Sequence, residues 1–126
     1  MSGTRCLLDT NVVIGLLKQH TAAIALIEAH QLDLNQVAIS QITPRMELLG
    51  YPGLPKEEER QIQGFLQSCR VLVIDETVEQ CAIQLRRSGS CKLPDAIIAA
   101  TALVHQLTLL TLDKKLSALV SQHTRP

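Results

Sequence analysis

Four short apolar runs alternate with helical patterns along this chain, and this alternation constrains the fold more than any other feature of the sequence. The runs predict strands over residues 4–9, 37–39, 71–74 and 108–111. Apolar residues spaced three and four apart predict helices around residues 12–17, 21–29, 41–49, 55–69, 78–87, 94–104 and 113–120. Strands that alternate with helices form a parallel sheet that is covered on both faces. The sequence therefore predicts a three-layer α/β/α sandwich with a mainly parallel sheet of about four strands.

Length and local signals add detail to this prediction. A chain of 126 residues is close to the usual domain size of about 150, so we expect a single domain over residues 1–126. The helix around 94–104 is apolar on nearly all sides and is expected to be central. Thr21 is expected to cap the second helix.

The composition excludes several classes of protein. With 46% hydrophobic and 19% charged residues the chain is not disordered. Lys and Arg together number 12, as do Asp and Glu, which argues against a globally basic nucleic-acid binder but leaves room for a local basic patch. Tyr51 and Phe65 are the only aromatic residues, so bases cannot be held by stacking on aromatic platforms.

Membrane and metal-thiolate signals are weak. The longest apolar runs fall well short of the ~20 residues that span a bilayer, and Met1–Leu8 lacks the apolar region of a signal peptide. The four cysteines, at positions 6, 69, 81 and 91, have no Cys-x-x-Cys spacing, which favours free thiols over a zinc site. We expect a reduced, cytoplasmic protein with no membrane partner.

Four acidic residues fall where ligands collect in a parallel sheet, at the carboxyl ends of the strands. Asp9 ends the first predicted strand, and Asp113 follows the fourth. Glu47 lies in the helix after the second strand, and Asp95 begins the helix that returns to the fourth strand. Each aspartate is also a plausible helix cap or first-turn acid. Glu47 is not explained by capping, although acids in such positions are usually solvated.

The convergence of these carboxylates favours a metal site. Carboxylates gathered at a water-poor edge repel one another unless a cation is present. Oxygen ligands without Cys or His partners favour Mg²⁺ or Mn²⁺ over zinc. Such an ion can polarise a phosphodiester and lower the pKa of a bound water, which fits phosphodiester hydrolysis.

Four segments resemble the successive motifs of PIN domains, and most closely those of the VapC-type ribonuclease toxins of toxin–antitoxin pairs. The resemblance covers nearly the whole chain and is carried by residues 7–11, by 39–43 with 46–48, by 93–102 and by 110–113. It implies an endoribonuclease dependent on Mg²⁺ or Mn²⁺, usually dimeric and inhibited by a co-encoded antitoxin.

The resemblance also assigns residues. It places the acidic quartet of the family, as catalytic and metal-binding residues, at Asp9, Glu47, Asp95 and Asp113, with supporting polar positions at Thr10, Asn11 and Thr111. Two departures from the family pattern stand out. Residues 122–126 do not provide the edge strand that many members carry, and Leu116 stands where an aromatic residue is frequent.

Other residues and functions remain open. Arg86, Arg87 and Lys92 can contact RNA phosphates beside the metal site, or they can form a solvated helix end. A phosphohydrolase of the haloacid dehalogenase kind also places an aspartate after its first strand, but that chemistry needs a second acid where this chain has Asn11. A non-catalytic scaffold that binds RNA or protein is the other alternative, although such a scaffold would be free to lose an acid. The sequence leaves open which RNA is cut and which antitoxin binds.

Overall fold

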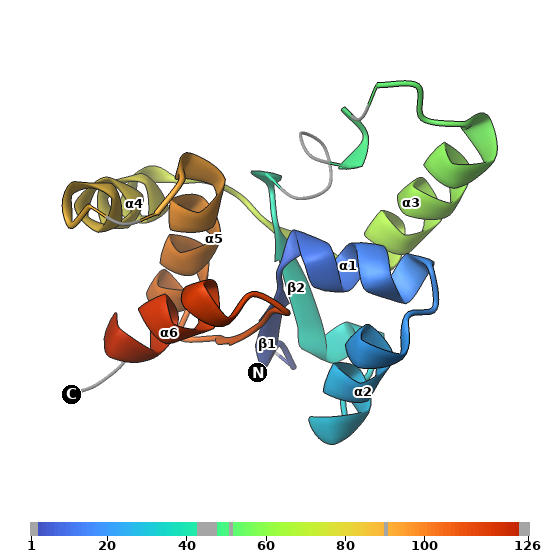
Figure 1. The fold of residues 1–126 in the computed structure, drawn as a ribbon, viewed down its shortest axis with the longest axis horizontal. Coiled ribbons are helices and arrows are strands. Elements are labelled where there is room, and N and C mark those ends of the chain that lie inside the picture. Colours follow the sequence, from blue (N-terminus) through green and yellow to red (C-terminus); the bar gives the residue numbers. More distant parts are fainter. Residues whose placement is uncertain (1–2, 43–47, 51, 90, 124–126) are drawn as a thin grey trace.

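The computed structural model describes residues 3–42, 48–50, 52–89 and 91–123, which alternate between strands and helices as the sequence predicts. The elements in chain order are β1 (Cys6–Leu8), α1 (Thr10–Leu17), α2 (Thr21–Ala29), a 3₁₀ turn η1 (Leu34–Gln36), β2 (Val37–Ser40), α3 (Lys56–Ser68), β3 (Arg70–Leu72), α4 (Glu76–Arg87), α5 (Leu93–Val104), β4 (Thr108–Leu110) and α6 (Lys114–His123). Figure 1 shows the helices arranged around the short strands.

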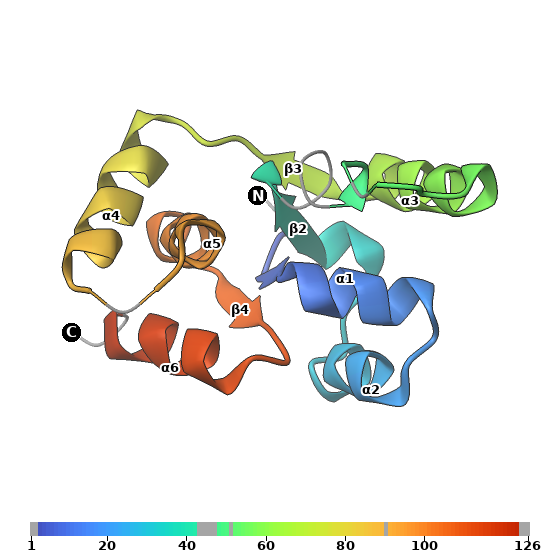
Figure 2. The ribbon, with the colours of Figure 1, turned by 45° about the horizontal axis from the view of Figure 1, so that its top comes forward.

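The sheet contains four strands in the order β3-β2-β1-β4, and all of its neighbouring pairs are parallel. Cys6 lies opposite both Val37 of β2 and Thr108 of β4. This arrangement confirms the predicted parallel sheet and leaves β3 and β4 as the edge strands. Figure 2 shows β3 and β4 on opposite sides of the two central strands.

Two apolar cores lie on the two faces of the sheet. Leu7 and Ala38 face a core shared with α4, α5 and α6, whereas Leu8 and Ile39 face a core shared with α1, α2 and α3. The side chains alternate along each strand because successive residues point to opposite faces. Helix α5 is the central helix that the sequence predicts, with six of its twelve residues buried.

The structure corrects two predicted boundaries. The third strand covers Arg70–Leu72 rather than residues 71–74. It lies at the edge of the sheet, and the apolar run continues beyond it into Val73, whose side chain is 58% exposed. Thr21 is the first residue of α2 rather than its cap, and His20 holds the capping position without a side-chain hydrogen bond. The predicted helix over 41–49 lies mostly outside the described residues.

Three helices are followed by a glutamine in the left-handed backbone region, two residues after the helix ends. Gln19, Gln31 and Gln106 have φ values of 57°, 51° and 56° and follow α1, α2 and α5. Left-handed residues commonly terminate helices, but the position usually belongs to glycine or asparagine. The three helix ends agree with the predicted ranges, although glutamine is not the usual residue for the left-handed position.

Within the described residues, no single helix is both long enough and apolar enough to cross a membrane. Helices α1 and α2 reach that length and apolarity only together, and they are bent by 110° relative to each other.

Candidate active site

Asp9 lies at the carboxyl end of β1, in the position that caps helix α1. Its Oδ1 accepts a hydrogen bond from the Thr10 N–H at 2.8 Å, and its Oδ2 accepts one from the Thr111 hydroxyl at 2.7 Å. The residue is only 6% exposed. A buried carboxylate needs such donors, since an unpaired charge in the interior is costly. Asp9 therefore caps helix α1, which is one of the two roles that the sequence allows for it. Its second oxygen also bonds Thr111, just after β4.

Thr111 and Asn11 join the two strand ends around Asp9. The Thr111 hydroxyl accepts hydrogen bonds from the Asp113 N–H at 3.0 Å and from the Asn11 side-chain amide at 3.4 Å. The side-chain oxygen of Asn11, Oδ1, accepts a hydrogen bond from the Leu112 N–H at 3.1 Å. This network fixes the turn between β4 and α6 against the start of α1. The structure thus brings the three predicted polar residues, Thr10, Asn11 and Thr111, to the same edge of the sheet as Asp9.

Asp113 follows this turn and caps α6. Its Oδ1 accepts hydrogen bonds from the Lys115 N–H at 2.9 Å and the Leu116 N–H at 3.3 Å. These two donors occupy one carboxylate oxygen. No group in the described part of the chain bonds its other oxygen, Oδ2, which is therefore available to a ligand.

Asp95 lies in the first turn of α5 and is partly buried. Within the described part of the chain its carboxylate takes part in no hydrogen bond or ion pair. Burial raises the pKa of Asp95, the negative charge of Asp113 raises it further, and the positive charge of Lys92 lowers it. The charge of Asp113 thus acts on Asp95 from the start of α6, a helix that packs against α5.

Glu47, the fourth predicted acid, lies outside the described residues. Among the described residues, no three acidic, histidine or cysteine side chains are grouped closely enough to enclose a metal ion. Mg²⁺ does not need such an enclosure, because it is commonly bound through one or two carboxylates and keeps several waters. Asp95 and Asp113 supply only oxygen ligands, and a divalent cation between them would offset the charge that raises the pKa of Asp95.

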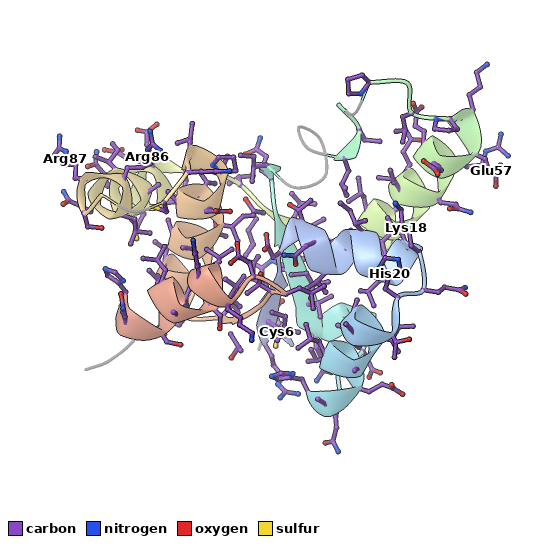
Figure 3. All side chains as sticks on the ribbon, in the orientation of Figure 1. Cys6, Lys18, His20, Glu57, Arg86 and Arg87 are labelled. Atoms are coloured by element: carbon purple, nitrogen blue, oxygen red, sulfur yellow. The ribbon has the colours of Figure 1, made fainter. Side chains whose placement is uncertain are left out.

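The three predicted basic residues do not lie in equivalent places. Arg86 and Arg87 are exposed in the last turn of α4, and Figure 3 shows them at the margin of the molecule. One guanidinium nitrogen of Arg86 donates a hydrogen bond to the Cys91 carbonyl at 3.0 Å, which supports the connection to α5. Lys92 holds the capping position of α5 and acts electrostatically on Asp95. Of these three basic residues, Lys92 is the one whose charge acts on Asp95.

Two polar residues near the strand ends form hydrogen bonds that the sequence did not predict. The Gln41 side-chain oxygen accepts a hydrogen bond from the Ile74 N–H at 2.9 Å, and this bond links the ends of β2 and β3. Asp75 caps α4 by accepting a hydrogen bond from the Val78 N–H. The signal for Asp75 was an acid three residues before an apolar helical position, which is a usual capping spacing.

Known proteins resemble the chain in both sequence and structure. The PIN domain family model matches residues 6–120. A toxin–antitoxin complex from Klebsiella pneumoniae contains a chain that is 33% identical, with a TM-score of 0.74 over 87% of this chain and 88% of that chain. FitAcB from Neisseria gonorrhoeae is 29% identical, with a TM-score of 0.75 over 92% and 93% of the two chains. VapBC-1 from nontypeable Haemophilus influenzae is 25% identical, with a TM-score of 0.73 over 94% of both chains.

No curated protein sequence gave a significant match. The family match nevertheless covers most of the chain and includes β1, α5 and β4, which carry or adjoin Asp9, Asp95 and Asp113. It agrees with the all-parallel sheet of four strands and confirms the resemblance drawn from the motifs. The chain therefore belongs to the PIN domain family of nucleases.

Proposed function

We propose that this protein is an endoribonuclease that depends on Mg²⁺ or Mn²⁺, hydrolyses RNA phosphodiester bonds, and acts as the toxin of a toxin–antitoxin pair. The observation that carries the proposal is the pair formed by Asp95 and Asp113, with Asp9 held at the same edge of the sheet. Burial and the charge of Asp113 disfavour the ionised form of Asp95 unless a cation accompanies it. We assign Asp9, Asp95, Asp113 and Glu47 as the catalytic and metal-binding residues.

The residues of the site have separable roles in this proposal. When bound, a divalent cation would polarise the phosphodiester and make a water molecule more acidic. Thr111 and the Thr10 N–H fix the orientation of Asp9 before a substrate arrives. Asn11 steadies Thr111 through its side-chain amide, so that Thr10, Asn11 and Thr111 act as positioning residues.

RNA is expected to approach over the amino end of α5. Lys92 lies there, and its ammonium group can attract a phosphate while it also offsets the charge of Asp95. Arg86 and Arg87 are exposed at the end of α4, six and five positions before Lys92, and can extend this contact along the RNA backbone. Because the net charge of the chain is zero, attraction of RNA has to come from a local group of cations rather than from the charge of the whole protein.

The partners follow from the same proposal. The related structures from Klebsiella pneumoniae and Haemophilus influenzae are described as a toxin–antitoxin complex and as VapBC-1, which supports a co-encoded antitoxin for this chain. We also expect a homodimer of single-domain chains, in the cytoplasm. The exposed apolar side chains of Val73, Ile83 and Leu93, at and near α4, support an interface of this kind.

A cleavage assay tests the catalytic part of the proposal. Purified protein should cut RNA at internal positions with Mg²⁺ or Mn²⁺, and EDTA should stop the reaction. Asp9→Asn and Asp95→Asn should each lower turnover by about a hundredfold or more, the upper range for lost metal ligands or their supports. Asp33→Asn is the matched control. Asp33 precedes η1 and β2, at the end of the sheet where the strands begin, and its substitution should leave turnover unchanged.

Two outcomes would contradict the proposal. Full cleavage in excess EDTA would remove the metal from the mechanism. Binding of RNA without cleavage under any divalent cation would instead favour the alternative of a non-catalytic scaffold.

A further inference from the structure

Three exposed lysines adjoin the carboxylates of the candidate active site. Lys92 holds the capping position of α5, three residues before Asp95. Lys114 and Lys115 are the first two residues of α6 and follow Asp113 directly. The contact with RNA described above uses Lys92 and leaves the two lysines of α6 without a role.

The two lysines of α6 lie where a helix does not favour positive charge. The amino end of a helix carries a partial positive charge, so acids in the first turn strengthen the helix and cations weaken it. Helices α3 and α4 have three and two glutamates in their first turns. The first turn of α6 has no acidic residue, and its cations are offset by the cap at Asp113. The charges of Lys114 and Lys115 therefore do not serve the stability of the helix that they begin.

No protein acid neutralises these two lysines. Within the described part of the chain, the ammonium groups of Lys114 and Lys115 form no ion pair and no hydrogen bond. Both side chains are exposed, while the backbone N–H of Lys115 is fixed by its bond to Asp113 Oδ1 at 2.9 Å. Two positive charges are thus held beside Asp113 and are open to an anion from solution.

The proposed reaction supplies such an anion. RNA carries a negative phosphate at every nucleotide, and proteins contact these phosphates with lysine and arginine side chains. Lys92 and the α6 lysines belong to different helices, and each group adjoins a different acid, Asp95 or Asp113. An RNA strand that contacts both groups therefore passes over both acids.

We propose that Lys114 and Lys115 bind phosphates of the RNA substrate, so that the RNA backbone is held from α6 as well as from α5. Lys92 then contacts the strand on the Asp95 side of the scissile bond, and the α6 lysines contact it on the Asp113 side. Contacts on both sides favour cleavage at internal positions, since a strand that ends at the site loses one of them. This inference rests on the proposed function, because it takes RNA to be the substrate.

The test measures how salt weakens RNA binding to the full chain. The probe is a fluorescein-labelled single-stranded RNA of mixed sequence, about 12 nucleotides long, and EDTA keeps it uncut. Fluorescence anisotropy gives the binding constant between about 0.05 and 0.5 M KCl. Each phosphate contact on a single strand contributes about 0.7 to the steepness of the plot of log K against log salt concentration.

Lys114→Gln/Lys115→Gln should reduce this steepness by about 1.4, because two phosphate contacts are lost. Since the two proteins should bind alike near about 1 M salt, the change corresponds to about 25-fold weaker binding at about 0.1 M. Lys114→Arg/Lys115→Arg keeps both charges and should keep the slope of the wild type.

A second double variant separates these contacts from a general effect of charge. Lys18→Gln/Lys56→Gln also removes two exposed lysines, at the end of α1 and the start of α3, and should leave the slope unchanged. Figure 3 shows Lys18, and Glu57, which follows Lys56, on the side of the molecule away from α6.

Urea unfolding separates a contact with substrate from a structural role. Lys114→Gln/Lys115→Gln should be at least as stable as the wild type, because it removes cations from the amino end of α6. A lower midpoint of unfolding in this variant, together with the lost slope, would assign the lysines a structural role and overturn the inference.

The inference is also overturned if Lys114→Gln/Lys115→Gln keeps the slope, if Lys18→Gln/Lys56→Gln loses as much, or if the wild type does not bind the probe. A slope that depends on the α6 lysines in a protein that cuts no RNA with Mn²⁺ would support these phosphate contacts and contradict the proposed function. Cleavage of RNA with a slope that does not depend on them would do the reverse, so the two failures are distinguishable.

Discussion

Asp95 is an acid whose pKa is raised by its surroundings in the folded chain. Burial and the charge of Asp113 raise its pKa, so the folded state holds a proton on this group more tightly than the unfolded state does. Above the ordinary pKa of an aspartate, about 4, the ionised form therefore weakens the fold. The stability that the proton provides is present at low pH and is lost as the pH rises through the raised pKa of the folded state.

This sign gives a prediction for the metal-free protein. Asp95→Asn should be at least as stable as the wild type at neutral pH, because it removes the unfavourable charge and no described hydrogen bond. The advantage should shrink as the pH falls toward about 4, where both states of the wild type become protonated. Urea unfolding between about pH 3.5 and 7 in EDTA measures it. A variant that is less stable by the same amount at every pH would show that Asp95 is structural.

Thr111 is the residue that connects Asp9 to the rest of the site. Thr111→Val keeps the shape of the side chain and removes the hydroxyl, which donates to Asp9 and accepts from Asp113 and Asn11. We expect a loss of about 1–3 kcal/mol in the free energy of unfolding, because buried partners lose their hydrogen bonds. RNA cleavage should fall as well, since Asp9 loses its orientation.

Thr111→Ser is the control for that variant, because it keeps the hydroxyl and should retain most of the activity. Equal activity of the Val and Ser variants would mean that the hydroxyl does not position Asp9.

At the scale of elements, the crossing of α1 and α2 is set by a glycine. A Cβ atom on Gly15 would lie 2.6 Å from the Ala23 Cβ, well inside contact distance. Gly15→Ala should therefore destabilise the fold by about 1–3 kcal/mol in urea unfolding, despite the better helix propensity of alanine. The matched change Gly64→Ala in α3 meets no atom within 4 Å and should stabilise by about 0.5–1 kcal/mol. Equal effects at the two positions would contradict this account of the crossing.

The elements also show how far sequence patterns reach. The order of strands and helices was predictable, because apolar periodicity and the parallel-sheet rule depend on local residues and on topology alone. The end of β3 was not, because Val73 lost its burial through the edge position of the strand. The ends of α1, α2 and α5 agree with the predicted ranges, although the left-handed residues that follow them, Gln19, Gln31 and Gln106, are not of the type usually found at such a position.

The candidate site divides in the same way. The placement of Asp9, Asp95 and Asp113 at one edge follows from the order of the elements. The bond between Thr111 and Asp9 joins residues 102 positions apart, and its geometry required the folded chain. The assignment of Glu47 stays a prediction, and so do the catalytic roles of the other three acids.

At the scale of the whole molecule, the account links a metal to the stability of the fold. Two apolar cores hold the four strands in place, and the strand ends then bring carboxylates together at a cost that a cation would offset. A ligand that binds only the folded state stabilises it by mass action, by about 2.7 kcal/mol at 100 times its dissociation constant. The central claim therefore predicts a stability effect as well as a catalytic one.

Thermal unfolding of the EDTA-treated protein with and without Mn²⁺ tests that claim most directly. The melting temperature of the wild type should rise with Mn²⁺, and Asp33→Asn, at the end of the sheet where the strands begin, should show the same rise. Asp95→Asn should lose most of the rise while its metal-free melting temperature stays at or above that of the wild type, and Glu47→Gln should also lose it. A full Mn²⁺ shift in Asp95→Asn, equal to that of Asp33→Asn, would contradict the assignment of this edge as the metal site.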